Sequence, residues 1–248
     1  MIYVFIGPTI PVHEARAILQ ASYLAPAEAG DIAARVRDRP EAFALIDGYY
    51  EQRPAVRHKE ILYALSEGIP VFGAASIGAL RAAELDSFGM IGVGTIFEAF
   101  RVGTYTDDDE VAVNHAPASH EFKPLSDAMA NIRAGLRDAR RRELLTGDEH
   151  DRLVSLGKRR FYGDRTWKTL VRDGVSAGLD PSRMERLLSF VADTAPNAKR
   201  DDARALLKRL ARREIGPPQV NFDFERTELF EHFLAAAHER LGGLGELE

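Results

Sequence analysis

Short apolar runs alternate with segments of helical apolar spacing over the first half of the chain. Residues 2–6, 43–46 and 69–74 are predominantly apolar, and the first two runs end at the turn-forming pairs Gly7-Pro8 and Asp47-Gly48. Such runs predict buried strands, and the spacing between them predicts helices over residues 11–20, 31–37, 56–66, 77–86 and 95–102. Because strands separated by helices pair in parallel through right-handed crossovers, we expect an α/β domain whose sheet is covered on both faces.

The pattern changes after the acidic residues 107–110. One further short strand is predicted over residues 111–113. Beyond Pro117 the apolar spacing is helical, and amphipathic helices are predicted over residues 124–145, 148–161, 165–176, 181–193, 199–213 and 225–241. The sequence therefore predicts the α/β class, with an N-terminal parallel-type α/β domain (residues 1–118) and a mostly helical C-terminal region (residues 119–248) that helps to bind partners.

Composition narrows the range of partners. The chain has 248 residues, of which 45% are hydrophobic and 29% charged, and its formal net charge is −5. The basic surface typical of nucleic-acid binding is missing, so no nucleic-acid partner is expected. No apolar run approaches the roughly 20 residues that span a bilayer, and residues 1–7 are too few for the apolar region of a signal peptide. We therefore expect a cytoplasmic protein without a membrane partner.

The chain contains no cysteine, which excludes disulfides, thiolate zinc sites and a cysteine nucleophile. Residues 107–110, with His115 and His120, are of metal-binding types. Consecutive carboxylates point in different directions, however, and no H-E-x-x-H type of spacing occurs. Gly7-Pro8-Thr9 also lacks the glycine patterns of nucleotide sites. We expect neither a metal nor a cofactor.

A serine stands at the predicted junction of the third strand and its helix. Ala74, Ser76 and Gly78 occupy the three defined positions of a G-x-S-x-G pattern, with alanine in place of the first glycine. Small neighbours allow the sharp strand-to-helix turn that exposes a nucleophilic serine, and amides at the new helix N-terminus can stabilise an oxyanion. Serine is also a common helix cap. Both interpretations of Ser76 remain open from the pattern alone.

A serine nucleophile needs a base, and His58 and Lys59 lie at the start of the preceding predicted helix. The start of a crossover helix lies at the carboxyl edge of its sheet, where the Ser76 turn also emerges. A lysine base must be neutral, which requires desolvation or a nearby positive charge. A solvent-facing Lys59 and a structural His58 are the alternatives.

Two blocks, residues 58–65 (HKEILYAL) and 68–85 (GIPVFGAASIGALRAAEL), resemble the core of the TfuA-like proteins. The similarity covers about residues 1–135. It extends to residues 4–8 (VFIGP), 46–50 (IDGYY), 109–115 (DEVAVNH) and 124–127 (PLSD).

The resemblance implies an accessory role beside YcaO enzymes, which use ATP to activate a peptide backbone amide so that sulfur replaces its oxygen. TfuA-like partners are thought to help dock the peptide substrate on YcaO. They are also thought to release sulfide from a ubiquitin-like (ThiS-like) carrier that ends in a thiocarboxylate. The implied serine–lysine pair falls on Ser76 and Lys59, with Lys168 as the alternative lysine. Amides near Ile77 and Gly78 would then hold the oxyanion.

Three hypotheses therefore stand. The first is an accessory hydrolase for peptide thioamidation, and it suits a chain without cysteine because sulfur would pass as a thioacid or as sulfide. The second is a non-catalytic adaptor that binds and activates a YcaO enzyme, with Ser76 serving only as a helix cap. The third is a stand-alone serine hydrolase that acts on an ordinary ester or peptide.

Overall fold

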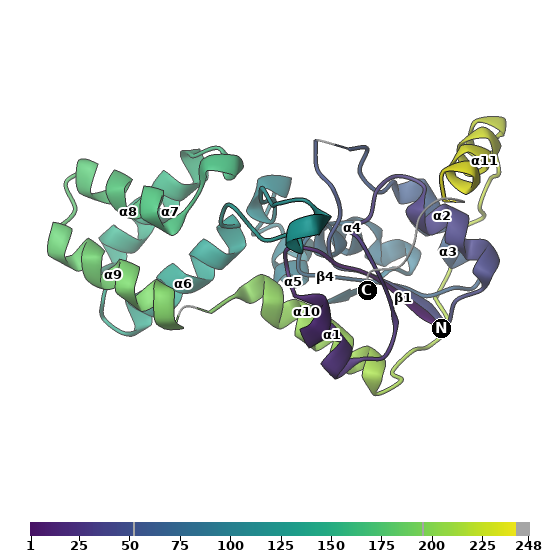
Figure 1. Cartoon of the computed structure of the whole chain (residues 1–248), viewed down its shortest axis with the longest axis horizontal. Coiled ribbons are helices and arrows are strands. Elements are labelled where there is room, and N and C mark those ends of the chain that lie inside the picture. Colours follow the sequence, from purple (N-terminus) through teal and green to yellow (C-terminus); the bar gives the residue numbers. More distant parts are fainter. Residues whose placement is uncertain (52, 195, 242–248) are drawn as a thin grey trace. The chain divides into compact units, whose positions relative to one another are not determined.

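A five-stranded parallel sheet forms the centre of the N-terminal part in the computed structural model, which describes residues 1–51, 53–194 and 196–241 (Figure 1). Its order is β2-β1-β3-β4-β5, and every pair of neighbouring strands is parallel. This confirms the predicted α/β class. The strands are β1 (Ile2–Phe5), β2 (Ser22–Leu24), β3 (Ala42–Leu45), β4 (Val71–Ala74) and β5 (Ile91–Val93).

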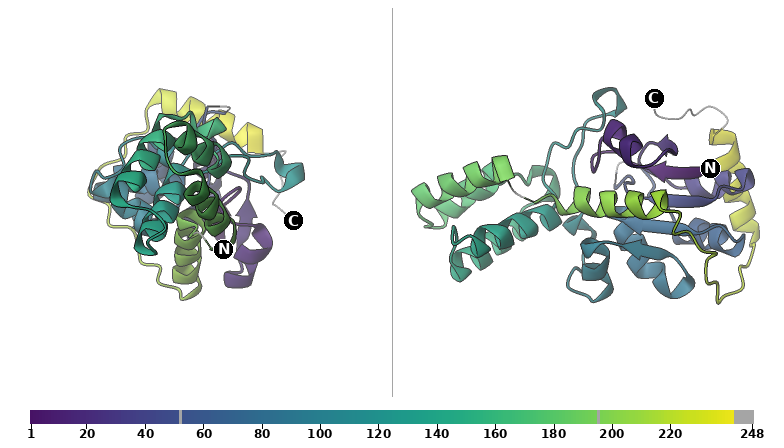
Figure 2. Two further views of the ribbon diagram at one scale, coloured as in Figure 1. Left: turned by 90° about the vertical axis from the view of Figure 1, so that its left-hand side faces the viewer. Right: turned by 90° about the horizontal axis from the view of Figure 1, so that it is seen from below.

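Helices cover both faces of this sheet. On one face Val4, Ala44 and Phe72 pack with helices α1 and α10, which approach the sheet from distant parts of the sequence (Figure 2). On the other side of the chain's N-terminal part, α11 packs against α2 (Figure 1). The helices of this part are α1 (Val12–Ile18), α2 (Asp31–Arg35), α3 (His58–Ser66), α4 (Ile77–Leu85), α5 (Thr95–Arg101), α10 (Ala198–Ala211) and α11 (Glu228–Leu241).

The chain divides into two compact units, and the division differs from the predicted boundary at residue 118. The first unit joins residues 1–106 to the chain from Arg200 onward, and the second is residues 107–199. The reason is α10, whose Asp202 carboxylate accepts hydrogen bonds from the amides of Thr95 (2.9 Å) and Ile96 (2.8 Å) at the start of α5. Helices predicted for a C-terminal region thus complete the α/β unit.

The second unit is helical and has its own apolar core. Met129, Leu153, Leu170 and Met184 are among the buried residues of this core. Its α-helices are α6 (Met129–Arg141), α7 (Gly147–Arg159), α8 (Trp167–Ser176) and α9 (Pro181–Thr194). Each lies within or close to a predicted helix.

The strand predicted over residues 111–113 is not formed, and that prediction was wrong. Val111 and Ala112 are buried as expected. The Val111 carbonyl accepts a hydrogen bond from the Lys199 ammonium (2.8 Å) instead of from a neighbouring strand. Burial explains why residues 111–113 are apolar. The Lys199 side chain supplies the hydrogen bond that a neighbouring strand would otherwise give to the Val111 carbonyl.

None of the helices in the described part of the chain has the length and apolar character needed to cross a membrane.

Candidate functional site

The Ser76 turn joins β4 to α4 through two residues, Ala75 and Ser76, and the first of them adopts a left-handed conformation. Ala75 has a φ of 67°, and the Ser76 amide donates to the Ala74 carbonyl oxygen at 2.7 Å. A hydrogen bond over two residues with positive φ at the centre defines a strained form of γ-turn. Such a conformation in a residue other than glycine costs on the order of 1–3 kcal/mol. The local sequence therefore holds Ser76 in place at an energetic cost.

Two glycines let the first turn of α4 lie directly on the sheet backbone. A Cβ on Gly78 would stand 1.8 Å from the Leu45 carbonyl oxygen, and a Cβ on Gly73 would stand 2.0 Å from the Gly78 carbonyl oxygen. Real Cβ atoms do not approach backbone oxygens so closely. The small residues that predicted a tight turn are therefore required for the contact of α4 with β3 and β4.

Ser76 is the N-cap residue of α4, yet its hydroxyl makes no capping hydrogen bond to the helix amides, all of which belong to described residues. The residue is 3% exposed. The helix-cap interpretation of Ser76 therefore lacks the contact that it requires. The hydroxyl lies at a helix N-terminus, where the dipole favours negative charge, but it does not cap the helix amides.

The two amides predicted to hold an oxyanion differ in their surroundings. The Gly78 amide donates to the Ile46 carbonyl oxygen at 3.3 Å, so an oxyanion would compete with that bond. The Ile77 amide belongs to the first residue of α4, a position with no intrahelical acceptor. Ile77 is thus the better placed of the two predicted donors.

Lys59 is engaged by the C-terminal part of the first unit. Its Nζ lies 3.3 Å from the Thr227 hydroxyl oxygen and 5.5 and 5.6 Å from the ring centroids of Phe224 and Phe230. These contacts hold the ammonium within an aromatic environment. They do not include Ser76.

The neighbouring candidate base, His58, also contacts a residue other than Ser76. Its Nε2 lies 2.7 Å from a carboxylate oxygen of Glu84, and Glu84 lies about two turns beyond Ser76 on α4, roughly 12 Å along the helix axis. Lys168, the alternative lysine, is exposed at the start of α8 in the second unit. The structure therefore brings Ser76, Ile77 and Gly78 together. The contacts found for the two candidate lysines, Lys59 and Lys168, do not include Ser76.

Asp47 lies at the candidate site, although the sequence pattern predicted no functional role for it. It is 1% exposed. Its carboxylate accepts hydrogen bonds from the amides of Gly7 (2.9 Å) and Thr9 (3.1 Å) and from the Thr9 hydroxyl (2.6 Å). In this strand order, ligands bind where the connections after β1 and β3 diverge. Asp47 ties the β1 loop to the β3 loop at that point.

The β3 loop also contacts the Ser76 turn. A Cβ on Gly48 would lie 2.8 Å from Cγ2 of Ile77, and the preceding Ile46 carbonyl accepts the Gly78 amide. Three loops, after β1, β3 and β4, therefore meet at the carboxyl edge of the sheet. The signal in the sequence was the block 46–50, whose aspartate directly follows a buried strand.

The acidic segment, defined as residues 107–110, is an ion-pair network. Lys158 Nζ lies 3.0 Å from Asp107 and 3.1 Å from Glu110, and it also pairs with Asp109. The fully buried Arg165 donates to Asp109 at 2.8 Å. Burial alone would raise the pKa of Asp109, but hydrogen bonds from Lys158 and Arg165 lower it below its ordinary value. Basic partners therefore occupy three of the four carboxylates, those of Asp107, Asp109 and Glu110, that composition alone associates with metals.

The part of the chain that the structure describes contains no group of three or more histidine and acidic residues placed to hold a metal ion. His115, one of the histidines considered with the acidic segment, has its Nδ1 2.8 Å from the Ala116 carbonyl oxygen.

Comparison with known families agrees with the sequence blocks. Residues 47–166 match the model of the family described as TfuA-like protein, so this part of the chain is similar to that family. The matched range contains Ser76, Lys59 and the acidic segment. No curated protein matches the chain.

Proposed function

We propose that this TfuA-like protein supplies sulfide for YcaO-dependent peptide thioamidation by hydrolysing the C-terminal thiocarboxylate of a ubiquitin-like carrier, with Ser76 as the nucleophile. The family is associated with YcaO-type thioamidation. The observation that carries the catalytic part is the Ser76 hydroxyl, which a strained turn holds at a helix N-terminus without a capping bond. Strained backbone, here at Ala75 directly before Ser76, is a common feature of functional sites.

The proposed reaction is acyl transfer in two steps. The Ser76 oxygen attacks the terminal carbonyl carbon, the hydroxyl proton passes to the base, and an oxyanion forms within reach of the Ile77 amide. The carbon–sulfur bond then breaks and sulfide leaves with the proton from the base. Water hydrolyses the resulting serine ester, so that thiocarboxylate and water give carboxylate and hydrogen sulfide.

The base of this proposal is Lys59, with Lys168 as the alternative. Lys59 lies inside the matched family range and on the helix that precedes β4. Its ammonium must leave Thr227 to reach Ser76, because the present contacts direct it toward the segment before α11. The proposal therefore predicts that catalysis depends on how residues 224–230 hold this lysine.

A second candidate is a non-catalytic adaptor that binds a YcaO enzyme and its peptide substrate. Two observations favour it: Ser76 is only 3% exposed, and Lys59 is hydrogen-bonded elsewhere. In this role the second unit and the surface of the first would provide docking, and Ser76 would contribute only to the turn.

The deciding experiment measures sulfide release from a thiocarboxylated ubiquitin-like carrier by the wild type and by Ser76→Ala, Lys59→Ala and Lys168→Ala. We expect Ser76→Ala and one lysine variant to lose roughly 10³-fold or more of the rate. Ser66→Ala and Lys208→Ala are matched controls, since both residues lie outside the site, and both should retain activity.

Equal release by the wild type and Ser76→Ala would exclude the hydrolase. Retention of YcaO-dependent thioamidation by Ser76→Ala would then support the adaptor. Hydrolysis of simple esters with no turnover of the carrier thiocarboxylate would instead support a stand-alone serine hydrolase.

A further inference from the structure

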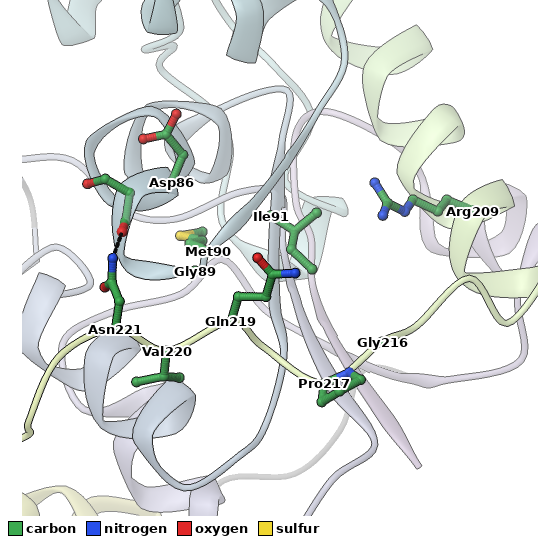
Figure 3. A pocket seen from close by; sticks show the side chains of 11 residues that line it. Asp86, Gly89, Met90, Ile91, Arg209, Gly216, Pro217, Gln219, Val220 and Asn221 are labelled. Atoms are coloured by element: carbon green, nitrogen blue, oxygen red, sulfur yellow. Dashed lines mark hydrogen bonds between the residues drawn. The ribbon is translucent and has the colours of Figure 1, made fainter.

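The first unit contains a cavity of about 500 Å³ between the turn that follows α4 and an extended strap, defined here as residues 216–221 (Figure 3). Met90 and Ile91 at the start of β5 form one wall, and Pro217 and Val220 of the strap form another. Arg209 reaches the cavity from α10. The volume lies within the range of roughly 300–1,000 Å³ that is typical of small-molecule sites.

Two contacts fix the strap over this cavity. The Asn221 side-chain amide donates to the Ser87 carbonyl oxygen at 3.0 Å. Gly89 has a φ of 100°, and a Cβ there would lie 2.6 Å from the Gln219 carbonyl oxygen. The strap therefore crosses the turn after α4 at a position that only glycine tolerates. These two contacts therefore fix the shape of the cavity.

Arg209 is the basic group of the cavity. Its guanidinium carbon lies 5.3 Å from the centroid of the Phe72 ring, and its Nε is buried without a hydrogen-bond partner among the described residues. The nearby Glu214 pairs with Arg212 at 2.6 Å. No carboxylate in the described ranges lies within ion-pair distance of Arg209. The hydrogen bond from Arg212 and the charges of Arg212 and Arg209 lower the pKa of Glu214, so Glu214 is a partial counterion of Arg209 at longer range. A partly desolvated cation without a carboxylate at ion-pair distance favours binding of an anionic group.

Figure 3 shows the guanidinium of Arg209 and the carboxylate of Asp86 on different sides of the cavity, with Ile91 and Gln219 between them. A single arginine suits a monoanion. The Asp86 carboxylate disfavours a dianion such as phosphate, because like charges repel. The remaining walls combine apolar side chains, such as those of Ile91 and Val220, with polar ones, such as those of Gln219 and Asn221, and the polar share is the larger.

We propose that this cavity binds a small organic monocarboxylate with a body that is partly polar and partly apolar, whose carboxylate pairs with Arg209. Ile91 begins β5, whereas Ser76 follows the end of β4, and the two strands are parallel. The cavity therefore lies at the opposite edge of the sheet from the Ser76 turn. The proposal is independent of the function proposed for Ser76.

The test uses ¹³C-methyl-methionine NMR of the full chain, titrated with N-acetyl-leucine as the probe. The chain has four methionines: Met90 lines the cavity, and Met129 and Met184 lie in the core of the second unit as internal references. We expect a saturable shift of the Met90 methyl signal alone. Arg209→Gln should weaken binding at least tenfold, whereas Lys208→Gln, on the exposed side of the same helix, should change it less than twofold.

The neutral analogue N-acetyl-leucine amide and inorganic phosphate complete the experiment. Neither should shift the Met90 signal at concentrations at which N-acetyl-leucine saturates. The proposal is overturned by the absence of a saturable shift in the wild type, by equal binding of the neutral amide, by stronger binding of phosphate, or by unchanged affinity in a folded Arg209→Gln variant.

Discussion

The Ser76 turn and the acidic segment are both rich in residues that catalyse reactions in other proteins, but the structure uses them in opposite ways. In the acidic segment, Asp107, Asp109 and Glu110 all pair with Lys158. At the turn, the backbone is strained at Ala75 and the Ser76 hydroxyl makes no capping bond to the described helix. Polar groups that satisfy one another stabilise a fold. A polar group held in a costly geometry without such a partner is the better candidate for chemistry.

The largest effect is expected at the glycine that seats the turn. Gly78→Ala should lower the free energy of unfolding by more than about 4 kcal/mol, because the new Cβ would lie 1.8 Å from a backbone oxygen. Helix propensity alone predicts a gain of about 1 kcal/mol. Urea denaturation followed by circular dichroism measures the difference. Gly147→Ala, in the first turn of α7 with only ordinary contacts, is the control, and equal stability of the two variants would contradict the close contact.

The next effect tests the acidic segment. Arg165→Met should destabilise the second unit by about 3–5 kcal/mol, because it removes one partner of a buried charged network. Arg165 is fully buried and donates to Asp109 and to the carbonyls of Gly157 and Arg160. Arg172→Met, at an exposed position, should change stability by less than about 0.5 kcal/mol. Fluorescence of Trp167, the single tryptophan, monitors this unit, and similar losses in both variants would refute the network's role.

Glu60 of the first unit and Asp109 of the second should contribute to the pH dependence of stability in opposite directions. Burial raises the pKa of Glu60 to about 7, although hydrogen bonds from amides such as those of Arg57 and Gly30 oppose the shift. Between its ordinary value of 4.5 and about 7, the folded state holds a proton that the unfolded state has released. The stability of the first unit should therefore fall by about 3 kcal/mol as pH rises through this window.

The contribution of Asp109 to the pH dependence of stability has the opposite sign. Its pKa is lowered from 3.8, so its contribution is present above that value and is lost as pH falls below it. Hydrogen exchange of α3 amides and Trp167 fluorescence, each recorded between pH 3 and pH 8, separate the two trends. Loss of both units in the same direction between pH 4.5 and pH 7 would contradict the assignment to Glu60.

The smallest effects are expected at the turn itself. Ala75→Gly relieves a left-handed conformation worth about 1–2 kcal/mol but adds chain entropy worth about 0.5–1 kcal/mol, so stability should rise by at most about 1 kcal/mol. Ser76→Ala should change stability by less than about 0.5 kcal/mol, since no capping bond to the described helix is lost. Thermal unfolding measures both, and a large loss in Ser76→Ala would show that the hydroxyl is structural after all.

Local pattern was sufficient for the turn but not for its surroundings. The small residues from Gly73 to Gly78 predicted a tight strand-to-helix junction, and the structure has one. The strands β2 and β5 were not predicted, because three residues are too few for a recognisable alternation. Their pairing with β1 and β4, rather than their own composition, makes them strands.

Long-range contacts explain the remaining differences. Lys59 and Thr227 are 168 residues apart, and Asp202 lies 107 residues beyond Thr95. No local periodicity indicates which helix returns to the sheet or which side chain it meets. The contacts that hold Lys59 away from Ser76 and the boundary of the α/β unit therefore had to come from the structure.

The return of α10 also has a consequence for synthesis on the ribosome. Helix α10, which covers Val4, Ala44 and Phe72 together with α1, is completed only after the whole of residues 107–199 has been translated. At about 5–20 residues per second, this interval lasts roughly 5–20 s. During that time one apolar face of the nascent sheet is covered only in part, while the second unit, which is continuous in sequence, can fold as soon as it emerges. Chaperone demand in the cell should therefore arise from the first unit.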